Sequence, residues 1–134
     1  VDVSSAPWSA SGPVLRGDAR IFETSEAPVA LVLGLGEALN EALEIGIDRI
    51  RERIEGLATL LRNRLSALPG VTVQDLGTVM SGLVSFTMER EPPHAIRDRL
   101  AACGIAVSVN GVGYTPLDMT ARGLDWVVRA SLSY

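Results

Sequence analysis

A long amphipathic repeat constrains the fold of this chain more than any other feature. Its apolar members recur at three- and four-residue steps, and they are Ile47, Ile50, Ile54, Leu57, Leu61, Leu65 and Leu68. This spacing predicts a helix over about residues 48–68, with Pro69-Gly70 ending it. Arg51 and Glu55 lie four residues apart on the polar side, where they can pair.

A second helix is predicted just before it, over residues 29–45. Its apolar positions cover more than one side, so we expect it to be buried against another element or another subunit. Gly46 can end this helix and Asp48 can help to start the next. Gly34 and Gly36 lie inside the helical pattern with no strand before them, which favours close helix packing over a dinucleotide-binding loop.

After Pro69 the period changes from helical to alternating. Strands are predicted at residues 71–76, 83–88, 105–109 and 126–132, a helix at residues 93–103, and a Gly-rich loop at residues 110–116. Helices and strands do not alternate strictly. We therefore expect an α+β fold, in which long helices accompany a small, mostly antiparallel sheet covered by helices on one face.

Composition narrows the classes of partner. The 134 residues have a net charge of −4 and no basic cluster, which argues against nucleic acid or an acidic membrane surface. No apolar run is long enough to span a bilayer. One cysteine gives neither a disulfide framework nor zinc spacing, which suits the cytoplasm. The chain starts without Met and stops directly after a strand-like run, so both ends look cut.

No catalytic or metal-binding constellation emerges from the residues themselves. His94, the only histidine, lies beside two prolines at a helix start and is expected to be solvated. Cys103 is expected to be a buried structural thiol at the end of that helix. The acidic residues are scattered, and no pair is marked as acid and base.

Arg129 is the one residue that stands out. It interrupts an apolar strand, which is unusual unless the guanidinium reaches an anion or a cleft. Arginine is the side chain best suited to bidentate binding of a carboxylate. A structural arginine that reaches water or pairs with an acid explains the strand equally well.

Five segments together resemble class V aminotransferases, a family that includes cysteine desulfurases and isopenicillin-N-epimerase-like proteins. The ending Arg129-Ala130-Ser131-Leu132-Ser133-Tyr134 is similar to the family's "VRAS…YNT". The others are "RIFE" at 20–23, "VLGLGEAL" at 32–39, "EIGIDRI" at 44–50 and "GIAVSVNG" at 104–111. They occur in the family's order through nearly the whole chain.

The resemblance implies the C-terminal part of a homodimeric pyridoxal-phosphate (PLP) enzyme of fold type I. Residues 1–28 would link from the large domain, residues 29–68 would form interdomain helices, and residues 69–134 would be a truncated small α+β domain. Arg129 would hold the α-carboxylate of an amino-acid substrate, and Thr24 or Ser25 would contact the cofactor phosphate. The lysine that forms a Schiff base with PLP would lie upstream, because all twelve basic residues here are arginine. The chain alone would therefore be inactive and bind no PLP covalently.

Two departures from the family pattern shape the expected activity. The loop at residues 110–114 has no cysteine where desulfurases have their reactive one, so sulfur transfer by that route is disfavoured. Glu26 replaces a phosphate-binding threonine, and similar loops occur in the epimerase-like branch, to which we expect this chain to be closest. The alternative is a non-enzymatic α+β interaction or regulatory domain, in which Arg129 is structural.

Overall fold

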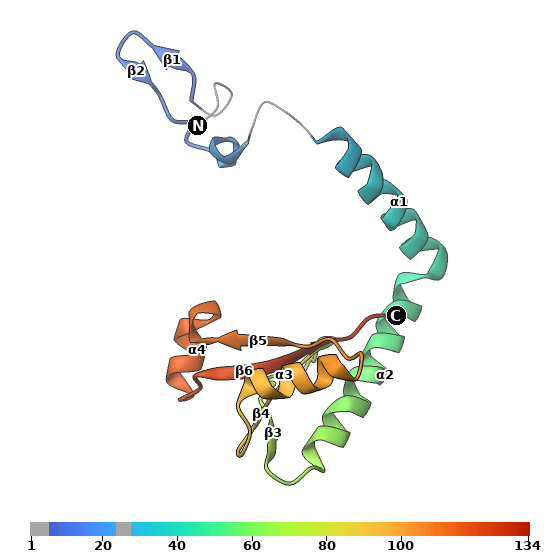
Figure 1. Cartoon of the computed structure of the whole chain (residues 1–134). Helices are drawn as coiled ribbons and strands as arrows, with labels where there is room; N and C mark the ends of the chain where they lie inside the picture. The colour runs from blue at the N-terminus through green and yellow to red at the C-terminus, as the bar shows by residue number, and fades with distance from the viewer. Residues whose placement is uncertain (1–5, 24–27) are drawn as a thin grey trace. The chain divides into compact units, whose positions relative to one another are not determined.

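The computed structural model describes residues 6–23 and 28–134, and it divides the chain into two compact units, Val1–Glu44 and Ile45–Tyr134 (Figure 1). The domain boundaries predicted at residues 28 and 68 stay predictions.

The first unit contains a small hairpin, a 3-10 turn and one long helix. Strands β1 (Trp8–Ser9) and β2 (Gly12–Pro13) pair antiparallel, and η1 (Ala19–Phe22) follows. Helix α1 spans Val29–Ile45, as predicted. No residue of α1 is buried within the described chain, and its apolar side chains are exposed on several sides, as at Leu35 (59%) and Leu39 (55%).

Helix α2 begins the second unit and confirms the amphipathic repeat. It spans Ile47–Ser66, two residues short of the predicted end. Gly46 caps its start with φ of 99°, a left-handed backbone that favours glycine, and thereby separates it from α1. Ala58, on its inner side, is completely buried. The apolar stripe therefore supplies one layer of the unit.

A four-stranded antiparallel sheet forms the second layer. Its strands are β3 (Val71–Val73), β4 (Leu83–Met88), β5 (Ser108–Gly111) and β6 (Trp126–Ser131), in the order β3-β4-β6-β5. The register pairs Phe86 with Val128 and Ser85 with Arg129. Because side chains alternate along a strand, these two pairs lie on opposite faces of the sheet.

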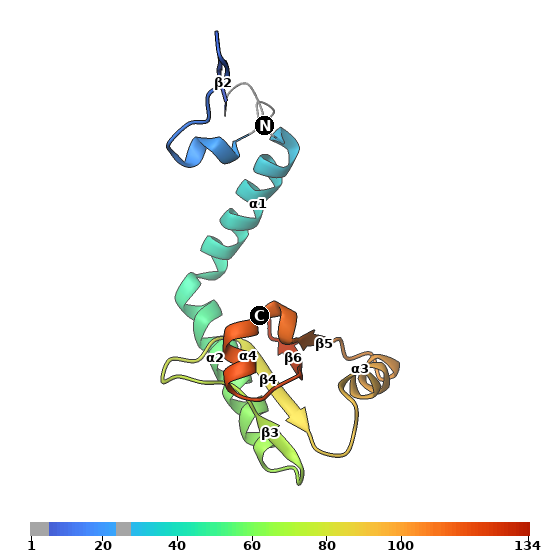
Figure 2. The same cartoon turned by 90° about the vertical axis from the view of Figure 1, so that its left-hand side faces the viewer.

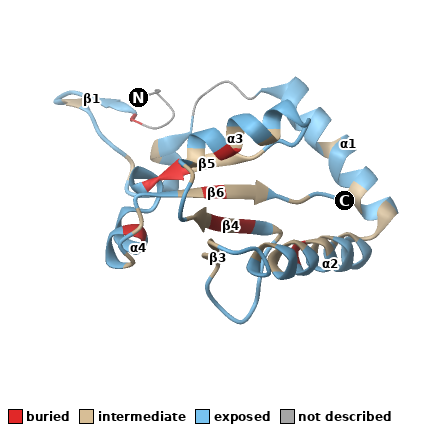
Figure 3. Cartoon of the chain, turned by 60° about the horizontal axis from the view of Figure 1, so that its bottom comes forward, coloured by how far each residue is buried: buried red, intermediate tan, exposed pale blue. Residues whose placement is uncertain are grey.

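The apolar face holds the core, and two helices cover it. Phe86 and Val128 pack there against Ile96 of α3 (Pro93–Ala102), with Leu65 of α2 and Leu100 of α3 beside them. Figure 3 shows the buried residues concentrated in β4, β5 and β6 and on the helices next to them. The predicted α+β fold, with helices covering one face of a small antiparallel sheet, is confirmed.

The segment between α3 and β6 differs from the prediction. Strand pairing begins at Ser108 rather than at residue 105, because only from Ser108 onward does the backbone pair with β6. The predicted Gly-rich loop instead contains the end of β5, a 3-10 turn η2 (Val112–Tyr114) and the start of α4 (Pro116–Ala121). Figures 1 and 2 show α4 next to the ends of β5 and β6 and apart from α3.

Candidate functional site

The sheet face that α2 and α3 leave uncovered is polar. Arg129 of β6 stands opposite Ser85 of β4 and Ser108 of β5 in the register of the sheet. Asn110, on the same face, is 8% exposed, and its Oδ1 accepts a hydrogen bond of 2.9 Å from the Ser108 hydroxyl. Because side chains alternate between the two faces, hydrogen-bonding groups of three strands lie around the Arg129 side chain on this face.

A cavity of about 370 Å³ opens on this face, and Arg129 lines it. Ser85 and Asn110 line the cavity from the sheet. Residues from η2 to the turn after α4 line its other side, and they are Tyr114, Thr115, Asp118, Met119, Arg122 and Leu124. The cavity combines apolar surface with a few converging polar groups, which is typical of small-molecule sites.

The guanidinium of Arg129 carries an unsatisfied donor. Among the buried side-chain nitrogens and oxygens of residues 6–23 and 28–134, Nε of Arg129 is the one without a hydrogen-bond partner. A buried donor left unpaired costs about 1–3 kcal/mol, and more when the group is charged. A planar anion that accepts from this guanidinium removes that cost, and a carboxylate matches its fork of donors.

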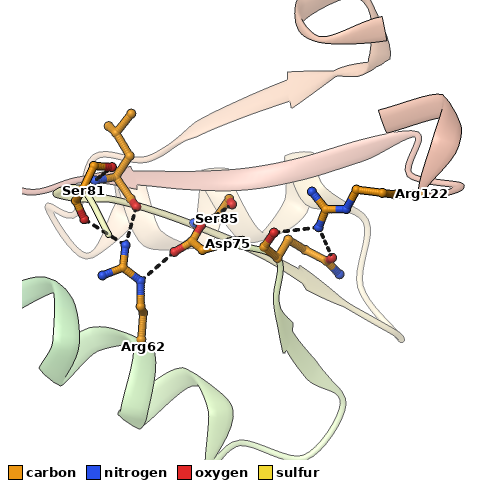
Figure 4. A network of polar contacts seen from close by, with 7 residues as sticks. Arg62, Asp75, Ser81, Ser85 and Arg122 are labelled. Carbon is orange, nitrogen blue, oxygen red and sulfur yellow. Dashed lines mark hydrogen bonds and ion pairs between the residues drawn. The ribbon is translucent and has the colours of Figure 1, made fainter. Parts of the chain in front are cut away.

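A second arginine lines the same cavity, and both of its terminal nitrogens are hydrogen-bonded. Arg122 Nη1 donates to Asp118 Oδ2 at 3.1 Å. Its Nη2 donates to the backbone oxygen of Gln74 at 2.6 Å and to Gln74 Oε1 at 2.9 Å (Figure 4). Arg122 therefore bridges the end of β3 and helix α4.

A third arginine supports the sheet beneath the cavity. Arg62 of α2 forms an ion pair of 2.7 Å with Asp75, and both side chains are largely buried, at 13% and 11% exposure. Asp75 Oδ1 accepts from the Ser85 backbone nitrogen at 2.8 Å and from the Ser85 hydroxyl at 2.5 Å. Arg62 Nη2 also donates to the backbone oxygens of Ser81 and Leu83, each at 2.8 Å (Figure 4). This network fixes β4 where it faces Arg129.

The other residues singled out in the sequence have different outcomes. Thr24 and Ser25 lie outside the described residues. His94 is exposed, as predicted, and its ring forms a T-shaped pair with Trp126 at a centroid distance of 5.3 Å. The prediction of a buried Cys103 is wrong: α3 ends at Ala102, and the thiol belongs to an exposed capping residue.

Among residues 6–23 and 28–134, no group of three or more histidine, cysteine and acidic side chains could hold a metal ion. Within the same residues, no helix is long and apolar enough to cross a membrane.

The residues that line the cavity with Arg129 were not predicted from the sequence. Ser85 could have been found, because it alternates with the apolar residues Val84 and Phe86 on a predicted strand. Helix α4 had a weaker signal, with Pro116 at its first position and Asp118 in its first turn. The pairing of Arg122 with Gln74 had none, since it joins positions 48 residues apart.

The fold and the cavity define a small α+β domain with an arginine-lined pocket on its open sheet face. The chain belongs to the aminotransferase class-V family, whose model matches residues 8–134.

Known proteins support this membership. The chain is 38% identical over 113 residues to a probable cysteine desulfurase of Halalkalibacterium halodurans, covering 84% of this chain and 27% of that protein. It superimposes on the cysteine desulfurase CsdA of Escherichia coli with a TM-score of 0.74 and 25% identity, over 97% of this chain and 32% of that one. The fold also matches C-DES, in a structure with glycine covalently linked to the PLP cofactor, with a TM-score of 0.66, 24% identity and coverage of 100% and 33%. The chain thus spans about a quarter to a third of the lengths of these proteins.

The cavity can accommodate an anion beside Arg129, and the chain offers no side chain for a covalent link to PLP. The sequence contains no lysine to form the Schiff base. Arg129, in contrast, lines the cavity, and its buried Nε has no hydrogen-bond partner among the described residues.

Proposed function

We propose that this chain is the C-terminal, substrate-binding part of a larger PLP-dependent enzyme that acts on an amino acid. Arg129 binds the α-carboxylate of the substrate, and the PLP and its lysine belong to the part of the protein upstream of this chain. The observation that supports this most strongly is the buried, unpartnered Nε of Arg129 in a cavity on the open face of the sheet. By this proposal the chain alone has no activity.

The role of Arg129 is to bind and orient. A bidentate contact with the carboxylate fixes two points of the substrate and leaves its amino group and side chain free to be placed elsewhere. Asn110 lines the same cavity, and its side-chain amide nitrogen can donate beside the anion. The chain thereby orients the substrate, and PLP, when bound, would withdraw electrons from it.

Sulfur transfer through a cysteine of this domain is not part of the proposal. The loop that ends in η2 carries Tyr114 at the cavity and no cysteine. The only thiol, Cys103, lies at the end of α3, the helix that packs on the opposite face of the sheet. We therefore propose an activity closer to the epimerase-like, aminotransferase or lyase members of the family than to a desulfurase.

The proposed assembly and cellular location are based on the exposed apolar side chains of α1 and on the single cysteine. A homodimer or a contact with the rest of the enzyme would cover α1, whose apolar side chains are exposed in this chain. A cytoplasmic location suits a chain with one free cysteine. Thr24 and Ser25 remain the proposed contacts of the cofactor phosphate.

The proposal is tested in the longer protein by replacing Arg129 with alanine and with lysine. Dissociation constants for the twenty standard L-amino acids, PLP absorbance and the melting temperature are measured for each variant. Weaker amino-acid binding by the alanine variant, with unchanged PLP loading and melting temperature, is the expected result. Lysine should restore part of the affinity, because it keeps the charge but lacks the fork. A lower melting temperature with unchanged amino-acid affinity would make Arg129 structural and support the non-enzymatic alternative.

A further inference from the structure

The two arginines that line the cavity differ in their hydrogen-bond partners. Arg129 has a buried donor without a partner, whereas Arg122 already faces the Asp118 carboxylate and two acceptors of Gln74. The Asp118 pair is partly exposed, at 25% and 50% side-chain exposure, so the two bonds to Gln74 are the stronger anchor of Arg122. Arg122 is therefore suited to holding the cavity together rather than to binding the substrate.

The Gln74 end of this link is rigid. The Gln74 backbone nitrogen donates to Ser85 O at 2.8 Å, and its Nε2 donates to Thr87 Oγ1 at 2.8 Å. Both acceptors belong to β4, the strand next to the one that carries Arg129. A group that is bound to Gln74 is thereby fixed to the sheet.

Helix α4, at the other end of the link between Arg122 and Gln74, depends on tertiary contacts for its position. Helix α4 has only six residues and packs mainly against η2. A helix this short is not stable by itself, so its place depends on tertiary contacts. Met119 is buried at 3% exposure, and Arg122 ties the last turn of α4 to Gln74.

We propose that Arg122 is a positioning residue that holds α4 as a wall of the Arg129 cavity. It contacts no substrate in this role. With the link in place, Asp118, Met119 and Leu124 line the same cavity as Arg129. Without it, α4 moves away and water competes with the carboxylate for the donors of Arg129. The inference rests on the proposed function of Arg129.

A double-mutant cycle in the longer, PLP-loaded protein tests the link. Arg122→Ala, Arg129→Ala and the double variant are compared, with L-cysteine and L-alanine as the binding probes. Hydrogen exchange at the Met119 amide, which donates to the N-cap oxygen Thr115 O at 3.0 Å, reports opening of α4 independently of activity. Arg99→Ala is the matched control, because it removes an exposed ion pair with Glu91 at the surface of α3.

We expect Arg122→Ala to speed exchange at Met119 and to raise the dissociation constant about tenfold, as small misplacements in a site do. When Arg129 is already replaced by alanine, Arg122→Ala should not change the dissociation constant further, because the guanidinium whose surroundings Arg122 positions is gone. Arg122→Lys should rescue little, because one ammonium cannot span Asp118 and both oxygens of Gln74. Arg99→Ala should alter neither quantity.

The possible failures are distinct. If Arg129→Ala weakens binding but Arg122→Ala does not, the positioning role is wrong and the proposed function stands. Additive effects of Arg122→Ala and Arg129→Ala would mean that Arg122 acts independently of Arg129, which also overturns the inference. If Arg129→Ala leaves binding unchanged, the proposed function itself fails.

Discussion

Arg129 of β6 and Ser85 of β4 are directly opposite each other in the sheet, and Ser85 is hydrogen-bonded to Asp75. The Ser85 hydroxyl donates to Asp75 Oδ1 at 2.5 Å, so its hydrogen is already engaged within the protein. The carboxylate of Asp75 is in turn paired with Arg62. Neither Ser85 nor Asp75 therefore neutralises the charge on Arg129, which is available to an anion that enters the cavity.

Removing the carboxylate of Asp75 should destabilise the second unit. Asp75→Ala leaves Arg62 without its acidic partner and frees the backbone nitrogen of Ser85. Breaking a buried ion pair from one side costs about 3–5 kcal/mol, and the slight exposure of this pair places the loss near the lower end, at about 3 kcal/mol. Chemical denaturation of the variant measures it.

Asp98→Ala is the matched control, because its pair with Arg97 is exposed. It should cost less than about 0.5 kcal/mol. Equal effects of the two substitutions would show that the Asp75 network does not stabilise the unit.

The 134-residue chain should not retain PLP. It has no lysine, so a stable Schiff base with a side chain cannot form. The chain is mixed with PLP, dialysed and scanned for internal-aldimine absorbance. Absorbance that resists dialysis would refute the expectation, and the longer protein serves as the positive control.

The same chain should self-associate through α1. Its apolar side chains lie on several sides of the helix and are exposed, including Leu31 at 73% and Leu43 at 66%. Sedimentation velocity across a range of concentrations should show species larger than a monomer. Leu31→Glu combined with Leu43→Glu should shift the population toward monomer.

Val79→Glu provides the comparison, because it adds a charge at another exposed apolar residue, at 91% exposure, outside α1. It should leave the association unchanged. A monomer at all concentrations would contradict the prediction for α1.

Strong periodicity explains which elements could be predicted. The α2 repeat extends over five turns, and the alternation at residues 83–88 gave the bounds of β4, Leu83–Met88, without error. Helix α4 was missed because six residues are too few to show a helical period. The buried Cys103 was mispredicted because the helical pattern was extended one residue beyond Ala102, past the point where α3 faces the sheet.

The site was predictable only in part. Arg129 was conspicuous, because a charged side chain in an apolar strand needs a reason. Its surroundings depend on which strands pair and in which register, and no local pattern specifies that Ser85 lies opposite Arg129. The partners of Arg122 and Arg62 likewise come from distant parts of the chain.

The most direct test of the account compares two ligands that differ only in the carboxylate. In the longer protein, dissociation constants are measured for L-cysteine and for cysteamine, with the native Arg129 and with Arg129→Ala. We expect the native protein to prefer L-cysteine, and Arg129→Ala to weaken L-cysteine binding by about 2–5 kcal/mol while leaving cysteamine nearly unchanged. Equal weakening of both ligands, or of neither, would contradict the assignment of Arg129 as the residue that binds the substrate carboxylate.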